Sequence, residues 1–160
     1  GAALATGLKS NRSVTELTLV RCGLGPGGGK ALGKCLETNR SIRALDLTQN
    51  DLGVEGGVAF GKALLVNTTL TRLSMRFNRI GFGLERATSF AEALAVNATL
   101  TSLDMAQNEL GALGGAAFAR ALEQNGALVT LDLQRNELGA QGGTALGSAV
   151  AVNTCLTALD

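Results

Sequence analysis

The sequence predicts an α/β fold. We expect a right-handed α/β solenoid, a horseshoe fragment with parallel strands on its concave face and helices on its convex face. The pattern L-x-x-L-x-L-x-x-N-x-L, which runs from Leu128 to Leu138, occurs in five copies, and a sixth begins at Leu156. An Asn opens each unit at intervals of 28, 28, 30, 28 and 28 residues. Because chance does not restore the phase at every copy, the chain is predicted to be a stack of repeats.

The repeats are predicted to form a single domain over residues 1–160. The expected units are 1–10 (the helix of a preceding repeat), 11–38, 39–66, 67–96, 97–124, 125–152 and 153–160 (the start of a truncated repeat). Neither end carries the polar capping unit that solenoids need for solubility. We therefore expect an excerpt of a longer protein, whose bare ends favour self-association.

Each unit begins with a predicted strand. In Leu45-Asp46-Leu47 and Leu131-Asp132-Leu133, as in the equivalent segments that begin at Leu17, Leu73 and Leu103, apolar residues flank a polar one. Side chains alternate between the two faces of a strand, so one face is expected to be buried and the other wet. The residue three positions beyond each of these segments leaves the strand for a loop, where an Asn amide can satisfy backbone groups without a ladder partner. It is Cys22, Asn50, Asn78, Asn108 or Asn136.

A predicted helix closes each unit. Ala59-Phe60 and Ala63-Leu64 repeat a small–large pair four positions apart, which gives one apolar stripe. At the helix end, Asn is expected to take the left-handed conformation. This position also explains four Asn-x-Ser/Thr triplets, which in a secreted protein would be glycosylation acceptors. They begin at Asn11, Asn39, Asn67 and Asn97.

The unit 67–96 carries two extra residues, within 82–86. We expect a longer loop or an extra half-turn before the helix. Surface loops tolerate such insertions, and this is the favoured interpretation. The alternative is a binding loop around Phe77 and Phe82.

These motifs resemble the ribonuclease-inhibitor-type leucine-rich repeats, because a period of 28 lies at the long end of the range of about 20–29 residues and leaves room for a helix. That group includes ribonuclease inhibitor, the GTPase-activating protein of Ran and the sensor regions of NOD-like receptors. The resemblance covers the whole chain, and it implies an interaction module that presents its concave strands to another protein.

Composition argues against several other classes. The 14 Lys and Arg residues nearly balance the 13 Asp and Glu residues, which gives no support for a nucleic-acid or membrane-surface partner. No apolar run reaches the roughly 18 residues of a membrane span. Cys22, Cys35 and Cys155 are an odd number at unrelated repeat phases, which favours a reducing, cytoplasmic compartment over a disulfide framework. Cys35 is expected to be a small hydrophobe.

No catalytic constellation is visible. The chain has no His, so no Ser/His/Asp or Cys/His pair can form. The segment 23–28 matches G-x-G-x-x-G, but the other repeats are glycine-rich at the same position, so the repeat explains it without a dinucleotide. We therefore predict no enzyme, no cofactor and no metal.

The outward strand positions form the candidate partner-binding surface. The polar residue at the centre of each strand, from Asp46 through Ser74 and Asp104 to Asp132, gives an acidic stripe that Arg72 and Arg76 interrupt. We expect these arginines to face Asp46 and Asp104, and adjacent carboxylates to raise one another's pKa. The predicted site contains Asp46, Arg72, Ser74, Arg76, Asp104, Asp132 and Gln134. Ordinary hydrated surface is the alternative interpretation of the stripe.

Two other functions remain open at this point. A GTPase activator resembling the Ran activator would use loop residues such as Arg76, Asn78 and Arg79 and would accelerate single-turnover GTP hydrolysis. A ligand-sensing region of a NOD-like receptor would require a nucleotide-binding domain upstream. The sequence identifies no partner, because the residues most common at binding hot spots, Trp and Tyr, are absent.

Overall fold

The computed structural model describes residues 1–81 and 87–160. These residues form six helices and six strands that alternate along the chain. The helices are α1 (Ala2–Ser10), α2 (Gly25–Leu36), α3 (Gly53–Val66), α4 (Ala87–Val96), α5 (Gly111–Gln124) and α6 (Gly139–Val152). The strands are β1 (Glu16–Thr18), β2 (Ala44–Asp46), β3 (Arg72–Ser74), β4 (Ser102–Asp104), β5 (Thr130–Asp132) and β6 (Ala158–Leu159).

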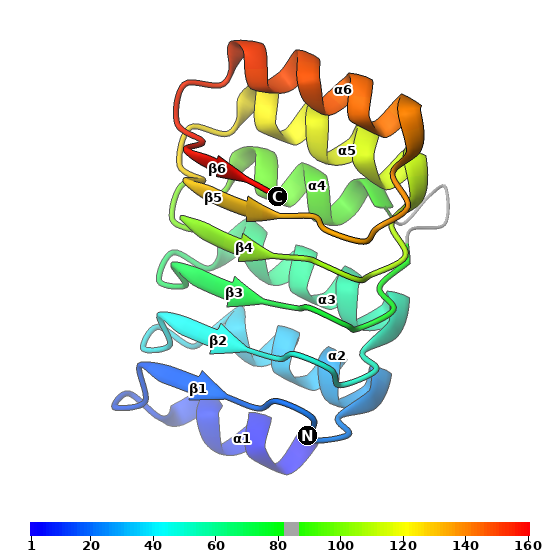
Figure 1. The fold of residues 1–160 in the computed structure, drawn as a ribbon. Helices are drawn as coiled ribbons and strands as arrows, with labels where there is room; N and C mark the ends of the chain where they lie inside the picture. The colour runs from blue at the N-terminus through cyan, green and yellow to red at the C-terminus, as the bar shows by residue number, and fades with distance from the viewer. Residues whose placement is uncertain (82–86) are drawn as a thin grey trace.

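The strands form one parallel sheet in the order β1-β2-β3-β4-β5-β6, so every unit pairs with its neighbours in the chain. Figure 1 shows the strands in one layer and the helices in a second layer behind it. The helix layer spreads over a greater length than the strand layer, so the strands line the inside of the curve. The predicted α/β solenoid is confirmed. Each of β1–β5 begins and ends one residue earlier than the Leu-x-Leu core that predicted it.

A continuous core lies between the two layers. Leu45, Leu73, Leu103 and Leu131 pair in register across the sheet, and all four are buried. Behind them lie the buried rings of Phe60, Phe90 and Phe118, one from each of three successive helices; the centroids of the last two are 6.1 Å apart. Each repeat is too thin to bury its own apolar residues, so the interior is shared along the stack.

The loop asparagines connect neighbouring repeats. The Asn108 side chain accepts a hydrogen bond from the Asn78 backbone N–H at 3.0 Å and donates to the carbonyls of Met75 and Met105, each at 2.9 Å. Asn50, Asn78 and Asn136 make equivalent bonds. All four are buried. The expected role, to satisfy loop backbone groups, is confirmed, and it extends across the boundary between units.

The left-handed conformation expected for the helix-end asparagines is wrong. Asn67 ends α3 with φ −83° and ψ 124°, an extended conformation, and Asn125 does the same after α5. The reason is hydrogen bonding: Asn67 Oδ1 accepts from the Thr69 and Leu70 N–H groups, while Nδ2 donates to Leu36 O of the previous repeat. Asn39, Asn67 and Asn97 are buried, which supports a structural role for these triplets over a glycosylation role.

Left-handed backbone occurs instead in the loops, on both sides of each loop Asn. Gln49 and Asp51 flank Asn50 with φ 59° and 55°, and Phe77 and Arg79 flank Asn78 with φ 57° and 51°. The same holds in the next two repeats, at Gln107, Glu109, Arg135 and Glu137. Side chains at these positions therefore project from a fixed turn that repeats every unit.

Glycine is required where two helices approach closely. A Cβ on Gly33 of α2 would lie 2.8 Å from Ala59 Cβ of α3, closer than carbon atoms can approach. Similarly, a Cβ on Gly29 would lie 3.1 Å from the Cα of Gly56. Helix packing thus accounts for two glycines that follow the segment 23–28, which matched the dinucleotide motif.

The predicted insertion at 82–86, including Phe82, lies outside the described residues. Helix α4, which follows it, has 10 residues, whereas α3 and α5 have 14 each. Among the described helices, none is long and apolar enough to cross a bilayer. The Cys35 side chain is buried, as predicted, and burial raises the pKa of its thiol.

Candidate functional site

The strand face consists of three columns of outward side chains that run across β1–β6. One column contains the first residue of each strand, the second the last residue of β1–β5 with Asp160 beside β6, and the third the residue two positions further on. Asp46, Ser74, Asp104 and Asp132 are paired in register in the second column. Arg72 belongs to the first column, and Arg76 and Gln134 to the third. All seven predicted site residues therefore lie on one face.

The aspartates of the second column hold the turns that follow their strands. Oδ1 of Asp104 accepts the Ala106 backbone N–H at 3.0 Å, and Oδ1 of Asp132 accepts the Gln134 N–H at 2.8 Å. Asp46 accepts both the backbone N–H and the hydroxyl of Thr48. Each carboxylate keeps its second oxygen for other contacts. The aspartates of the stripe therefore stabilise the turns after their strands. This structural role was not part of the interpretation of the stripe as hydrated surface.

A chain of polar contacts links β2 to β4. The Thr48 and Ser74 hydroxyls lie 3.1 Å apart, and Ser74 Oγ donates to Asp104 Oδ2 at 3.3 Å. Thr48 was missing from the predicted site. It could have been found by extending the alternation of outward residues one step beyond the strand, to the position that Arg76 and Gln134 occupy in their own repeats.

Arg76 crosses β4 to reach β5. Its Nη1 lies 3.4 Å from Asp132 Oδ2, and its Nη2 lies 3.5 Å from Gln107 Oε1. The β4 residue in the same column is Ala106, which is too short to block the guanidinium. The sequence placed Arg76 beside Asp46 and Asp104, and it did not predict an ion pair across the intervening strand. Asp132 is the paired residue, although Arg76 is close enough to Asp104 to act on its pKa.

Arg72 crosses β2 in the opposite direction. Its Nη2 lies 2.7 Å from Glu16 Oε1 on β1, past the short side chain of Ala44. Arg72 was expected to face Asp46 and Asp104; the ion pair that it forms is with Glu16, which the sequence did not predict. The Arg72–Glu16 side chains are 58% and 69% exposed, against 31% and 24% for Arg76–Asp132. Because water weakens exposed ion pairs, the Arg76–Asp132 pair is the more strongly held of the two.

Asp104 is the titrating group whose properties the surface changes most clearly. Burial raises the pKa of its carboxyl, and the nearby Asp132 adds to the rise. The Ala106 N–H, Arg76 and Ser74 act in the opposite direction. The sequence predicted that adjacent carboxylates raise one another's pKa, and for Asp104 this direction is confirmed. The main cause is desolvation, which the spacing of residues could not reveal.

Phe77 extends the strand face at the end of the third column. Its side chain is 43% exposed, its φ is 57°, and the Arg76 guanidinium carbon lies 5.5 Å from the ring centroid. The equivalent positions in other repeats hold Arg21, Gln49, Gln107 and Arg135. A bulky residue in left-handed backbone is uncommon. The sequence analysis gave the Phe77 loop and the strand face as alternative binding sites. In the structure Phe77 contacts Arg76, so the two form one surface.

A hollow of about 550 Å³ continues from Phe77 along the loops, where Arg79, Gln107 and Glu109 also line it. Arg79 pairs with Asp51 at 3.4 Å, and both side chains are exposed. Asn78, a contact residue in the GTPase-activator hypothesis, is fully buried, and its Nδ2 donates to three backbone carbonyls. It cannot meet a partner, so its place in that hypothesis is wrong.

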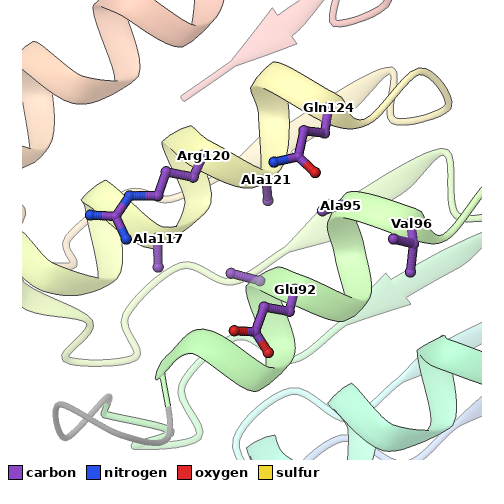
Figure 2. A pocket seen from close by; sticks show the side chains of 8 residues that line it. Glu92, Ala95, Val96, Ala117, Arg120, Ala121 and Gln124 are labelled. Atoms are coloured by element: carbon purple, nitrogen blue, oxygen red, sulfur yellow. The ribbon is translucent and has the colours of Figure 1, made fainter.

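The helix layer has a groove of its own, between α4 and α5. Figure 2 shows it lined by Ala95, Ala117 and Ala121, with Glu92 and Arg120 toward one end; its volume is about 310 Å³. These two charged side chains are exposed, and Gln124 is exposed as well. Binding sites fix orientation through a few well-placed polar groups among apolar walls. Among the described residues that line this groove, no polar side chain is buried, so the strand face is the better candidate.

Comparison with known proteins agrees with this geometry. The sequence model of a family described as Leucine Rich repeat matches residues 10–33, 38–61, 66–81, 96–119 and 127–147, which is more than half of the chain. The chain belongs to the leucine-rich repeat family. The leucine-rich repeats account for the regular Leu and Asn positions of the sequence. A search of curated protein sequences finds no match.

Solved structures with the same fold include the leiomodin-1 actin-binding site 2. It is 19% identical over 97% of this chain and 75% of the other, with a TM-score of 0.60. The tropomodulin C-terminal domain of Caenorhabditis elegans is 10% identical over 94% of this chain and 91% of the other, with a TM-score of 0.72. At these identities the similarity shows the fold alone.

Proposed function

We propose that this leucine-rich repeat chain is a protein–protein interaction module of the ribonuclease-inhibitor type, which binds a partner protein on its strand face. The contact residues are those predicted from the sequence, with Phe77 added as the central anchor. The site is Asp46, Arg72, Ser74, Arg76, Phe77, Asp104, Asp132 and Gln134. Its free thiols, one of them exposed at Cys22, suit a reducing intracellular compartment.

Phe77 is the observation that carries this proposal. Left-handed backbone costs a residue with a side chain roughly 1–2 kcal/mol, and Asn tolerates this region better than Phe. A half-exposed aromatic ring at such a position contributes little to the core. It is well suited to binding, because aromatic anchors next to an Arg are typical of hot spots.

The polar residues around Phe77 supply orientation. Arg76 and Asp132 are only 31% and 24% exposed, and they hold each other at 3.4 Å. A partner that covers them removes the remaining water, which strengthens charge-assisted hydrogen bonds and penalises any partner that leaves one unpaired. Ser74 and Asp104 extend this polar rim toward β2.

Site-specific crosslinking tests the proposal. A photoreactive residue is placed at Gln134, on the strand face, or at Arg120, on the helix face; both positions are exposed. Actin is the first candidate partner, because the leiomodin-1 region with the same fold is an actin-binding site; cell extract is the second source. We expect crosslinks from position 134 and not from position 120.

Affinity then tests the anchor. For a crosslinked partner in purified form, Phe77→Asn should raise Kd at least about tenfold, as loss of a hot-spot contact of about 1.4 kcal/mol does. Arg120→Ala on the helix face is the matched control and should leave Kd unchanged. Crosslinks confined to position 120, or a partner indifferent to Phe77→Asn, would refute the proposed surface.

A further inference from the structure

We infer that the partner on the strand face is an extended segment with two blocks of charge, acidic over β1–β3 and basic over β4–β6; this inference rests on the proposed function. The near-zero net charge of the chain conceals a strong separation. Residues 1–80 contain eleven Lys and Arg against five Asp and Glu, whereas residues 81–160 contain three against eight. The two halves therefore carry formal charges of +6 and −5.

Most of this separation lies in the strands and loops rather than in the helices. Outside α1–α3, the first half has seven Arg against four acidic residues. Outside α4–α6, the described second half has one Arg against five acidic residues, which are Asp104, Glu109, Asp132, Glu137 and Asp160. On the strand columns of β1–β3 the charges balance, because Glu16 and Asp46 offset Arg72 and Arg76. The positive excess of the first half therefore lies in the turns and loops beside those strands, whereas the strand columns of β4–β6 are acidic themselves.

Ion pairing leaves the separation in place. The pairs Arg72–Glu16 and Arg79–Asp51 lie within the first half, so each removes one charge of either sign there. Arg76–Asp132 spans the boundary between the halves. Within the described part of the chain, Arg21 and Arg43 have no carboxylate partner in the first half, and Asp104 and Glu109 have no cationic partner in the second.

The dimensions of the sheet favour an extended partner. Neighbouring strands lie about 4.8 Å apart, so β1 and β6 are separated by roughly 24 Å. Charges are screened over about 8 Å at physiological salt. A compact charged group therefore senses one half only. About seven extended residues, at roughly 3.3 Å each, would cross the whole face.

The order of the blocks is fixed by the face. Phe77 lies at the boundary between the halves, beside the loop hollow, and fits an apolar residue between the two blocks. The opposite order would place like charges together at both ends, which costs binding energy and excludes wrong partners.

Two synthetic peptides test the inference. Each has about ten residues, which is enough to span the face and extend slightly beyond it at both ends. The block peptide has a Glu run, a central Trp and a Lys run; the interleaved peptide has the same composition with Glu and Lys alternating. Fluorescence anisotropy at low salt should give a block peptide at least about tenfold tighter, since its charges match both halves. Equal affinities would overturn the inference.

Orientation gives a second, independent readout. A nitroxide on the Glu end should broaden amide NMR signals of β1 and β2, and a nitroxide on the Lys end those of β5 and β6. Arg72→Gln and Glu109→Gln should each weaken block-peptide binding several-fold, while Lys62→Gln on α3 should not. If the labels at both ends of the peptide broaden signals of the same strands, the proposed order of the charge blocks would be overturned. Competition between the peptide and a second copy of the chain would overturn it as well. Such a result, together with partner crosslinks at position 134, would leave the proposed function standing.

Discussion

Replacing Asn108 with Ala tests how the repeats are held together. The side chain is fully buried and has two roles. Its oxygen accepts the Asn78 N–H, which has no other acceptor among the described residues, and its amide donates to the carbonyls of Met75 and Met105. We expect Asn108→Ala to be strongly destabilising.

The magnitude follows from what each group loses. The Asn78 N–H becomes a buried unsatisfied donor, at a cost of about 1–3 kcal/mol. The two carbonyls lose less, because Met75 O keeps its bond from Asn78 Nδ2 and Met105 O keeps its bond from Asn136 Nδ2. These two losses add roughly 1 kcal/mol in all. A total of about 3 kcal/mol would lower the Tm of a domain of this size by roughly 6–12 °C.

The assay combines urea unfolding with amide hydrogen exchange. Cys22→Ala is the matched control, because Cys22 occupies the equivalent position in the first repeat but its exposed side chain makes only a weak contact to Val20 O. It should cost less than about 0.5 kcal/mol. The Asn78 amide should exchange faster in the Asn108 variant only. A loss below about 1 kcal/mol, or equal losses in both variants, would refute the reasoning.

Three further predictions concern backbone, packing and charge. Phe77→Asn should raise the free energy of unfolding by about 0.5 kcal/mol in urea melts, because relief of the left-handed backbone outweighs the lost cation–π contact; a loss of stability would contradict this. Gly33→Ala should destabilise by about 1–3 kcal/mol through overlap with Ala59, while Gly7→Ala, in open space on α1, should stabilise; equal effects in thermal melts would exclude the packing argument. Asp104→Asn should stabilise near pH 7, since the raised folded pKa means that the charged form is disfavoured in the folded state. This gain should vanish below about pH 4, as measured by urea unfolding at both pH values.

The sequence predicted the features that every repeat shares, because a contact that recurs in each repeat requires the same residue type at the same position. The buried Leu45, Leu73 and Leu103 and the bridging Asn108 could be recognised this way. The direction of Arg76 could not, since it depends on the short side chain of Ala106 on the intervening strand. Left-handed backbone at Gln49 was also missed, because its signal is usually a Gly or Asn, and here the buried neighbouring Asn fixes the turn.

The uniform loop turns also explain why the sequence predicted a strand-face site but not Phe77 as the anchor that we propose. The Asn ladder makes every loop turn alike, so any side chain beside it is held in place whatever its identity. Stability then depends little on whether that position holds Gln107 or Phe77. Because this position has no structural role, it can hold a residue that serves binding, at the small cost of a strained backbone. A repeat scaffold can therefore separate the residues that build it from those that recognise a partner, and we propose that Phe77 belongs to the second group.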